Sequence, residues 1–251
     1  MYDITQGLDI VSPSSSIENT RVPFDAGSLR MTEADGLLYI HSCHEMYPAN
    51  DGLNHQANMN VVIDEESMTK VDSAFEHNGY VSHSFDQFIQ TDGEYIYQLD
   101  LGDAYPRGVY LQRFSTDPTS SDYESNLMQM PSTTGNNFTG VSLGGFKLSE
   151  NNCIIAGESY NYWDEDVPGD SVHNIFVNIK DKNLNEIQTV WLTNYVFDDS
   201  TRARTPHLAK ISENKFMVMW EEKTEYMDNW DISRVSFKYP QNIGDLGNLC
   251  L

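Results

Sequence analysis

The stretch Ser28-Leu-Arg-Met-Thr-Glu-Ala-Asp-Gly-Leu-Leu-Tyr-Ile-His41 is typical of a strand, a tight acidic turn and a second, apolar strand. Three later stretches repeat it: Ser84-Phe-Asp-Gln-Phe-Ile-Gln-Thr-Asp-Gly-Glu-Tyr-Ile-Tyr97, Ser142-Leu-Gly-Gly-Phe-Lys-Leu-Ser-Glu-Asn-Asn-Cys-Ile-Ile155 and His207-Leu-Ala-Lys-Ile-Ser-Glu-Asn-Lys-Phe-Met-Val-Met219. The turns are Asp35-Gly36, Asp92-Gly93, Glu150-Asn151 and Glu213-Asn214, where Gly and Asn tolerate positive φ. Because the turns begin at 35, 92, 150 and 213, their spacings are 57, 58 and 63 residues, which indicates a fourfold repeat.

A second hairpin follows in each unit. Strands expected near 58–63, 108–114 and 173–179 lead into the turns Asp64-Glu65-Glu66, Asp117-Pro118 and Asp181-Lys182-Asn183. The fourth unit has a third strand near 231–237 and then loses strand character. Two hairpins make a four-stranded antiparallel sheet, which cannot bury both of its faces alone, and stacking such sheets around an axis solves that problem.

The sequence therefore predicts one all-β domain, a β-propeller of four four-stranded antiparallel blades, or five if the chain is part of a larger ring. The expected blades are 24–75, 80–131, 138–195, and 203–251 completed by residues 1–12 as an N-terminal closing strand. A β-sandwich is the other fold considered, but it explains the period poorly. In the third blade, Gly144-Gly145 is expected to allow two backbones to approach closely.

The charge restricts the possible partners. The chain has 38 acidic and 15 basic residues, a formal net charge of -23. Such a surface repels nucleic acid and anionic membranes, and no apolar run is long enough to span a bilayer. Cations, basic proteins and neutral glycans remain as partners. The three cysteines have no metal or redox spacing and are expected to be buried thiols.

Several strings resemble a family of β-propeller proteins, mostly secreted or cell-surface proteins of Gram-positive gut bacteria. Within residues 22–222 these strings include 34–47, 51–58, 79–85, 102–107, 140–146, 190–195 and 219–222. The resemblance implies the propeller fold and an extracellular or cell-surface location, and it implies no activity. The N-terminus itself lacks the charged and apolar regions of a signal peptide, which leaves the cytoplasm open.

Polar residues at the rim of a propeller converge near its axis, so the candidate ligand-binding residues are those expected at the rim and in aromatic loops. They are His83, Asp86, Asp100, Asp103, Tyr105, Arg107, His44, Glu45, Trp163 and Trp230. Aromatic side chains such as Trp163 can stack on sugar rings or anchor a protein. Arg107 could instead pair with Asp103 or Asp100 and order the loop between two hairpins.

Two metal sites come into consideration, and no cofactor is certain. Asp164, Asp166 and Asp170 supply the hard oxygen ligands that calcium prefers, although they do not form an EF-hand loop. The string His41-Ser-Cys43-His44 has the residue types of a transition-metal site. Alternation along a strand, however, puts His44 on the opposite face, and hydrogen-bonded strand residues are the simpler interpretation.

Three functions stay open at this point. The first is a non-catalytic propeller that recognises a glycan or a protein, since nucleophile and cofactor motifs are missing from the sequence. The second is a carbohydrate-active enzyme, a glycoside hydrolase or lyase, that uses rim carboxylates. The third is a structural subunit of a surface assembly that self-associates through its terminal strands.

Overall fold

A computed structural model describes residues 2–3, 8–9, 28–48, 54–75, 86–101, 109–128, 130–131, 137–138, 140–162, 172–195, 202–223 and 231–238. Every regular element in these ranges is a β-strand. The chain forms two compact units, one of residues 1–103 with 112–124 and one of residues 104–111 with 125–251. Each unit is described by itself.

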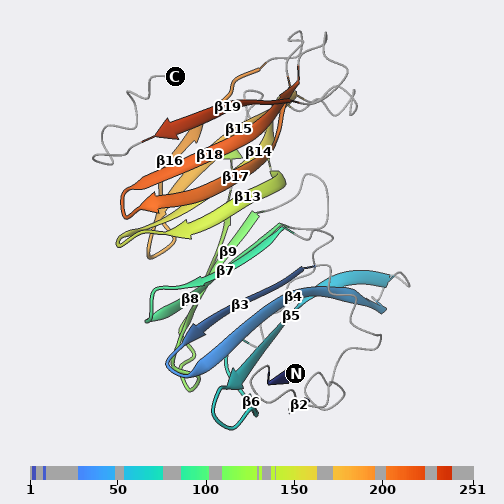
Figure 1. The fold of residues 1–251 in the computed structure, drawn as a ribbon, viewed down its shortest axis with the longest axis vertical. Coiled ribbons are helices and arrows are strands. Elements are labelled where there is room, and N and C mark those ends of the chain that lie inside the picture. Colours follow the sequence, from blue (N-terminus) through green and yellow to red (C-terminus); the bar gives the residue numbers. More distant parts are fainter. Residues whose placement is uncertain are drawn as a thin grey trace. The chain divides into compact units, whose positions relative to one another are not determined.

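The first unit contains one four-stranded sheet and most of a second (Figure 1). The first sheet has the order β3 (Ser28–Ala34), β4 (Leu37–Pro48), β5 (Asn54–Asp64) and β6 (Lys70–Val71). The second has β7 (Gln87–Thr91), β8 (Tyr95–Leu101), β9 (Val109–Ser115) and β10 (Tyr123–Met128). The short strands β1 (Tyr2–Asp3) and β2 (Leu8–Asp9) pair with each other.

The second unit contains a four-stranded sheet and a sheet with three described strands (Figure 1). One has the order β13 (Gly140–Leu148), β14 (Asn152–Tyr162), β15 (Val172–Asp181) and β16 (Glu186–Trp191). The other has β17 (Arg202–Ser212), β18 (Lys215–Lys223) and β19 (Asp231–Lys238), three strands in the described residues. The strands β11 (Met130–Pro131) and β12 (Asn137–Phe138) form a separate pair.

In all four of these sheets each strand pairs with its neighbour in sequence, which is the meander of a propeller blade. The first strands of successive sheets also lie beside each other, β3 beside β7 in the first unit and β13 beside β17 in the second. The predicted fold class, an all-β protein of propeller type, is confirmed. The single domain, the number of blades and closure of a ring by the N-terminal strand stay predictions.

Two of the four inner turns have the positive φ values that their Asp-Gly sequences favour. Ala34 pairs with Leu37, and the two residues between them have positive φ, 53° at Asp35 and 76° at Gly36. Gly93 has a φ of 96°. The turns at Glu150-Asn151 and Glu213-Asn214 also form, but neither Asn has a positive φ. In the last turn Ser212 pairs with Lys215, so this two-residue turn closes without a left-handed Asn.

Each outer turn begins with an aspartate whose side chain accepts a hydrogen bond from a backbone N–H two or three residues later. Asp64 Oδ1 accepts from Ser67 N at 2.7 Å, Asp117 Oδ1 from Thr119 N at 2.8 Å, and Asp181 Oδ1 from the backbone N of Asn183 at 2.8 Å. Hydrogen bonds to the charged form favour it, so those from Ser67 and Thr119 lower the pKa of Asp64 and Asp117. At Asp181 burial acts to raise the pKa, but hydrogen bonds from Asn185 and Asn183 outweigh it and lower the pKa.

Replacing Asp64 by alanine is predicted to lower thermal stability at pH 7. The folded-state pKa of Asp64 lies below its unfolded value, so its contribution is present in full above the unfolded value near 4 and is lost as pH falls through the folded one. Melting of both proteins by circular dichroism at pH 7, 4 and 3 checks this. The gap between the variant and the parent should narrow toward pH 3, and a constant gap would contradict the prediction.

The two glycines of β13 confirm the expected close backbone approach. An added Cβ at Gly144 would lie 2.1 Å from the carbonyl oxygen of Pro206 on β17, and one at Gly145 would lie 2.7 Å from Leu208 Cβ. Both separations are below van der Waals contact. The first strands of two sheets therefore come together at a point where no side chain fits between them.

Gly144→Ala is predicted to cost about 3 kcal/mol, the upper end of the cost of overpacking, because the obstructing atoms are backbone. Gly36→Ala is the matched comparison, since nothing lies within 4 Å of its added Cβ and only the positive φ opposes it. That strain costs about 1 kcal/mol. Urea unfolding followed by circular dichroism measures both costs, and equal values would show that β13 and β17 are not held this closely.

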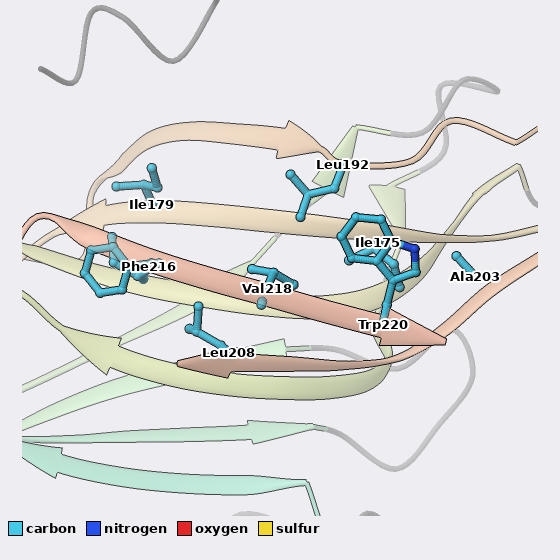
Figure 2. Packing of buried hydrophobic residues seen from close by; sticks show 10 residues of the cluster. Ile175, Ile179, Leu192, Ala203, Leu208, Phe216, Val218 and Trp220 are labelled. Atoms are coloured by element: carbon cyan, nitrogen blue, oxygen red, sulfur yellow. The ribbon is translucent and has the colours of Figure 1, made fainter. Parts of the chain in front are cut away.

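Each unit buries its apolar core between two sheets. In the second unit Ile154 and Ile175 of one sheet meet Leu208, Val218 and Trp220 of the other. Figure 2 shows the side chains of this core along β18 and the strands around it. The first-unit core contains residues of both sheets and three aromatics that pack edge to face, Tyr39, Phe75 and Phe114. Cys153 is a buried free thiol, as predicted; Cys43 and Cys250 lie outside the described side chains.

Candidate functional site

Three buried carboxylates lie in the second half of the second strands of three sheets. Each lies four residues after a core residue, Asp100 after Ile96, Glu158 after Ile154 and Glu222 after Val218. Because strand side chains alternate, all three point to the buried face. Their exposed fractions are 0%, 5% and 8%. Buried carboxylates need partners, so their surroundings define the candidate sites.

Asp100 belongs to a closed network in the first unit. Its Oδ1 lies 2.7 Å from His41 Nε2, and its Oδ2 accepts from Gln98 Nε2 at 2.6 Å. His41 Nδ1 lies 2.7 Å from Asn60 Oδ1, and none of these four side chains is more than 3% exposed. Both imidazole nitrogens are occupied, so His41 is not available as a metal ligand. The simpler interpretation of the His41 string, hydrogen-bonded strand residues, holds for His41.

Glu158 is the centre of a second cluster, in the second unit. His173 Nδ1 is bonded to Glu158 Oε1, while Ser142 Oγ donates to Oε2 at 2.9 Å. The backbone N of Thr205 donates to the same Oε2 at 3.1 Å. These donors come from β13, β15 and β17. Glu158 therefore joins three strands of two sheets at one strand end, and His173 is 32% exposed there.

The backbone at Thr205 is strained. Its φ is 53°, a left-handed value that is costly for a β-branched residue, and it also precedes Pro206. The strand pairing of β17 with β18 shifts register between Arg204 and His207, which marks a bulge. Bulges and strained residues are concentrated at functional sites, so this position is a candidate for one.

An ion pair lies beside the bulge. Arg204 Nε donates to Glu221 Oε2 at 2.9 Å, and the two side chains are 41% and 34% exposed. We call Ser142, Glu158 and His173, with the backbone of Thr205, the bulge site. Arg204 and Glu221 lie on the other face of the β17–β19 sheet, because strand side chains alternate and their neighbours Ala203 and Trp220 belong to the core. Trp220 and Glu222 flank Glu221 on β18, and Trp220 Nε1 donates to the buried Glu222 Oε2 at 3.3 Å.

The order of hydrogen bonds limits what the bulge site can do. Ser142 donates to Glu158 and not to His173, so the three do not form a nucleophile–histidine–acid relay. Both oxygens of Glu158 have donors, and the His173 side chain that is bonded to one of them is 32% exposed. Such an arrangement can bind polar ligands from a preorganised base.

Most predicted site residues lie outside the described residues: His83, Asp103, Tyr105, Arg107, Trp163, Trp230, Asp164, Asp166 and Asp170. The backbones of His44 and Glu45 lie in β4, and their side chains are outside the description. Asp86 is half-buried just before β7. Asp100 is fully buried and contacts side chains of the protein.

The sequence analysis missed His173, Glu158 and Arg204. Glu158 had a signal, since it is a charged residue ending the apolar run Cys153-Ile-Ile-Ala-Gly. The strain at Thr205 had none beyond a Thr-Pro dipeptide within a strand. Among the described residues no cluster of three or more metal-binding side chains occurs. In the same part of the chain no helix long and apolar enough to cross a bilayer is found.

Comparisons with known proteins identify no family for this chain. No family model matches the chain, and no curated protein matches it. A solved structure with some likeness is an endo-arabinase from Bacteroides thetaiotaomicron, 11% identical, with a TM-score of 0.39. The match covers 88% of this chain and 78% of that one. The resemblance to secreted propellers of gut bacteria stays a prediction.

Glu158→Ala is predicted to destabilise the second unit by about 1 kcal/mol for each of the part-buried hydrogen bonds that it removes. The alanine leaves Ser142 Oγ and Thr205 N without their acceptor and frees the bulge. Glu158→Gln keeps an acceptor oxygen and should cost less. Urea unfolding followed by tryptophan fluorescence measures both. Equal costs would show that the hydrogen bonds to Glu158 do not hold the strands together.

Proposed function

We propose that this protein is a non-catalytic binding propeller that recognises a neutral glycan at the bulge site. The observation that carries the proposal is the partly exposed imidazole of His173, which the buried Glu158 holds in place beside the strained backbone of Thr205. Sugar hydroxyls both donate and accept hydrogen bonds, and planar charged groups meet them with two atoms at once. An imidazole held in a fixed orientation can supply one of these hydrogen bonds to a sugar hydroxyl.

The charges at the site favour a neutral ligand over an ion. His173 is bonded to Glu158. An ionic ligand would have to break this pair and leave one partner uncompensated, whereas a hydroxyl group can join it. The net charge of -23 acts against acidic polysaccharides in the same way.

Binding is favoured over catalysis by the way the chemistry-bearing groups are engaged. Both oxygens of Glu158 and of Asp100 accept hydrogen bonds within the fold. A glycosidase needs one carboxyl to give a proton to the substrate and a second to act on the sugar ring. Groups occupied in this way serve structure, and the carbohydrate-active enzyme is left as an outcome of the test.

Two further expectations belong to the proposal. The resemblance to secreted propellers favours an extracellular or cell-surface location. Calcium at Asp164, Asp166 and Asp170 would add a ligand for sugar hydroxyls on the loop between β14 and β15. Each is open to direct measurement.

The proposal is tested by screening the purified protein on a glycan array, with calcium and with EDTA, and by calorimetry on the best hits. His173→Ala should weaken binding at least tenfold, because it removes the partly exposed hydrogen-bonding partner of the sugar. The control is Glu124→Gln, a carboxylate that pairs with Arg113 outside the second unit.

Three outcomes would overturn the proposal. They are no binding to any glycan, equal weakening by the control variant, and release of reducing ends or unsaturated sugars from a bound glycan. The last would indicate the enzyme. Loss of signal only in EDTA would support calcium in recognition.

A further inference from the structure

An exposed tyrosine ring lies at the start of β10 in the first unit. Tyr123 is 37% exposed, whereas the other aromatic side chains of the described residues are buried or half-buried. Its ring packs on Phe114 of β9, with the two centroids 5.0 Å apart and the ring planes tilted by 36°. A ring that is held from one side and exposed on the rest of its surface is a platform on which another ring can stack.

The hydroxyl group of this tyrosine is fixed as well. Gln112 Nε2 donates to Tyr123 Oη at 2.8 Å. Gln112 lies two residues before Phe114 on β9, so strand alternation places both side chains on the same face of the sheet. Because Tyr123 Oη accepts the hydrogen bond from Gln112, its own proton is left to be donated. Ring and hydroxyl are thus oriented before a ligand arrives, which lowers the entropic cost of binding.

The carbonyl oxygen of Gln112 supplies the second observation that points to a ligand. Gln112 is 7% exposed, and its Oε1 accepts no hydrogen bond from any residue that the structure describes. A buried carbonyl oxygen without a donor is costly and uncommon. Oε1 and Nε2 belong to one amide group, so Oε1 lies beside the hydroxyl of Tyr123. A ligand that donates to Oε1 and accepts from the tyrosine hydroxyl would satisfy both groups.

The charged neighbours of Tyr123 are engaged on the other face of the sheet. Alternation places Glu124 there, where it lies 3.2 Å from Arg113, and Arg113 lies over the ring of Tyr95 at 4.3 Å. Asp122 is hydrogen-bonded to the same Tyr95. Neither the two carboxylates nor the guanidinium is therefore placed to pair with a charged group on the exposed ring. This arrangement favours a neutral ligand over a cationic or an anionic one.

We propose that Tyr123 and Gln112 form a second carbohydrate-binding site, which belongs to the first unit and is additional to the bulge site of the second. The apolar face of a neutral pyranose ring stacks on the exposed part of the tyrosine ring. A hydroxyl of the same sugar donates to Gln112 Oε1, and because hydroxyl oxygens also accept, it can take the hydrogen bond that Tyr123 Oη offers.

Gln112→Leu separates binding a ligand from supporting the fold. Leucine keeps an apolar side chain of similar size beside Phe114 and removes the carbonyl oxygen that no described residue satisfies. The tyrosine hydroxyl that loses its donor is on an exposed residue, where water can replace the amide. We expect the unfolding equilibrium constant in urea to stay within about threefold of the parent, while the affinity for sugar falls about tenfold.

The measurement is carbon–proton NMR of the Tyr123 ring during titration with cellohexaose, xylohexaose and β-1,4-linked galactohexaose, three neutral oligosaccharides of pyranose rings. At least one of them should shift the ring signals of the parent to saturation. Tyr123→Ala should abolish the corresponding shift of the Gln112 side-chain amide. Met31→Ala is the control, since it truncates an apolar side chain of the same unit that is 57% exposed, and it should leave the titration unchanged.

The second site and the bulge site can fail separately. His173→Ala, which tests the bulge site, should leave the Tyr123 titration as it is in the parent. The second site is overturned by the absence of a saturable Tyr123 shift with all three sugars, or by parent-like binding of Gln112→Leu. A large loss of stability in Gln112→Leu would assign Gln112 to the fold and also overturn it. A shift caused by a lysine-rich peptide, and by none of the sugars, would indicate a protein partner instead. If Tyr123→Ala does not fold, Gln112→Leu decides.

Discussion

The structure depends on the burial of sheet faces against one another. A sheet of three or four strands exposes two faces, and the β13–β16 sheet cannot shield the side of Ile154 and Ile175 without the β17–β19 sheet. The first unit repeats the arrangement with the aromatic residues Tyr39, Phe75 and Phe114. Hydrophobic burial is nondirectional, so it brings the sheets together but does not set their distance. Gly144 and Gly145 set it where β13 meets β17, because any larger side chain would push the strands apart.

The same burial accounts for the polar chemistry of the fold. Each second strand continues past its core residues, and the carboxylates Asp100, Glu158 and Glu222 lie on the buried face as a result of strand alternation. A carboxylate out of water is costly unless donors surround it. Asp100 is satisfied by side chains of two sheets, whereas Glu158 draws on a serine, a histidine and a backbone N–H at a bulge. The first arrangement is closed, and the second leaves part of its partners exposed.

The difference in exposure between the Asp100 network and the Glu158 cluster decides which of the two can meet a ligand. A network of side chains that are at most 3% exposed cannot meet a ligand as large as a sugar. At the bulge site the buried carboxylate of Glu158 holds His173, which is 32% exposed, and Thr205 keeps a conformation that a free chain would avoid. Strain of this kind persists only where surrounding contacts enforce it. A rigid base with polar side chains above it suits recognition of a neutral polar ligand.

By itself the sequence determined the local structure. The turn at Asp35-Gly36 needs positive φ, the turns at Asp64, Asp117 and Asp181 need a side-chain acceptor, and Gly144 needs a close neighbour; each requirement is local and was predictable from residue type. The all-β fold followed from the period of those turns. Only the tertiary structure decided which polar residues meet: His41 with Asp100 and Glu158 with Thr205 are 59 and 47 residues apart in the chain. Such pairs depend on how one sheet stacks on the next, and neither strand alternation nor turn chemistry encodes that alignment.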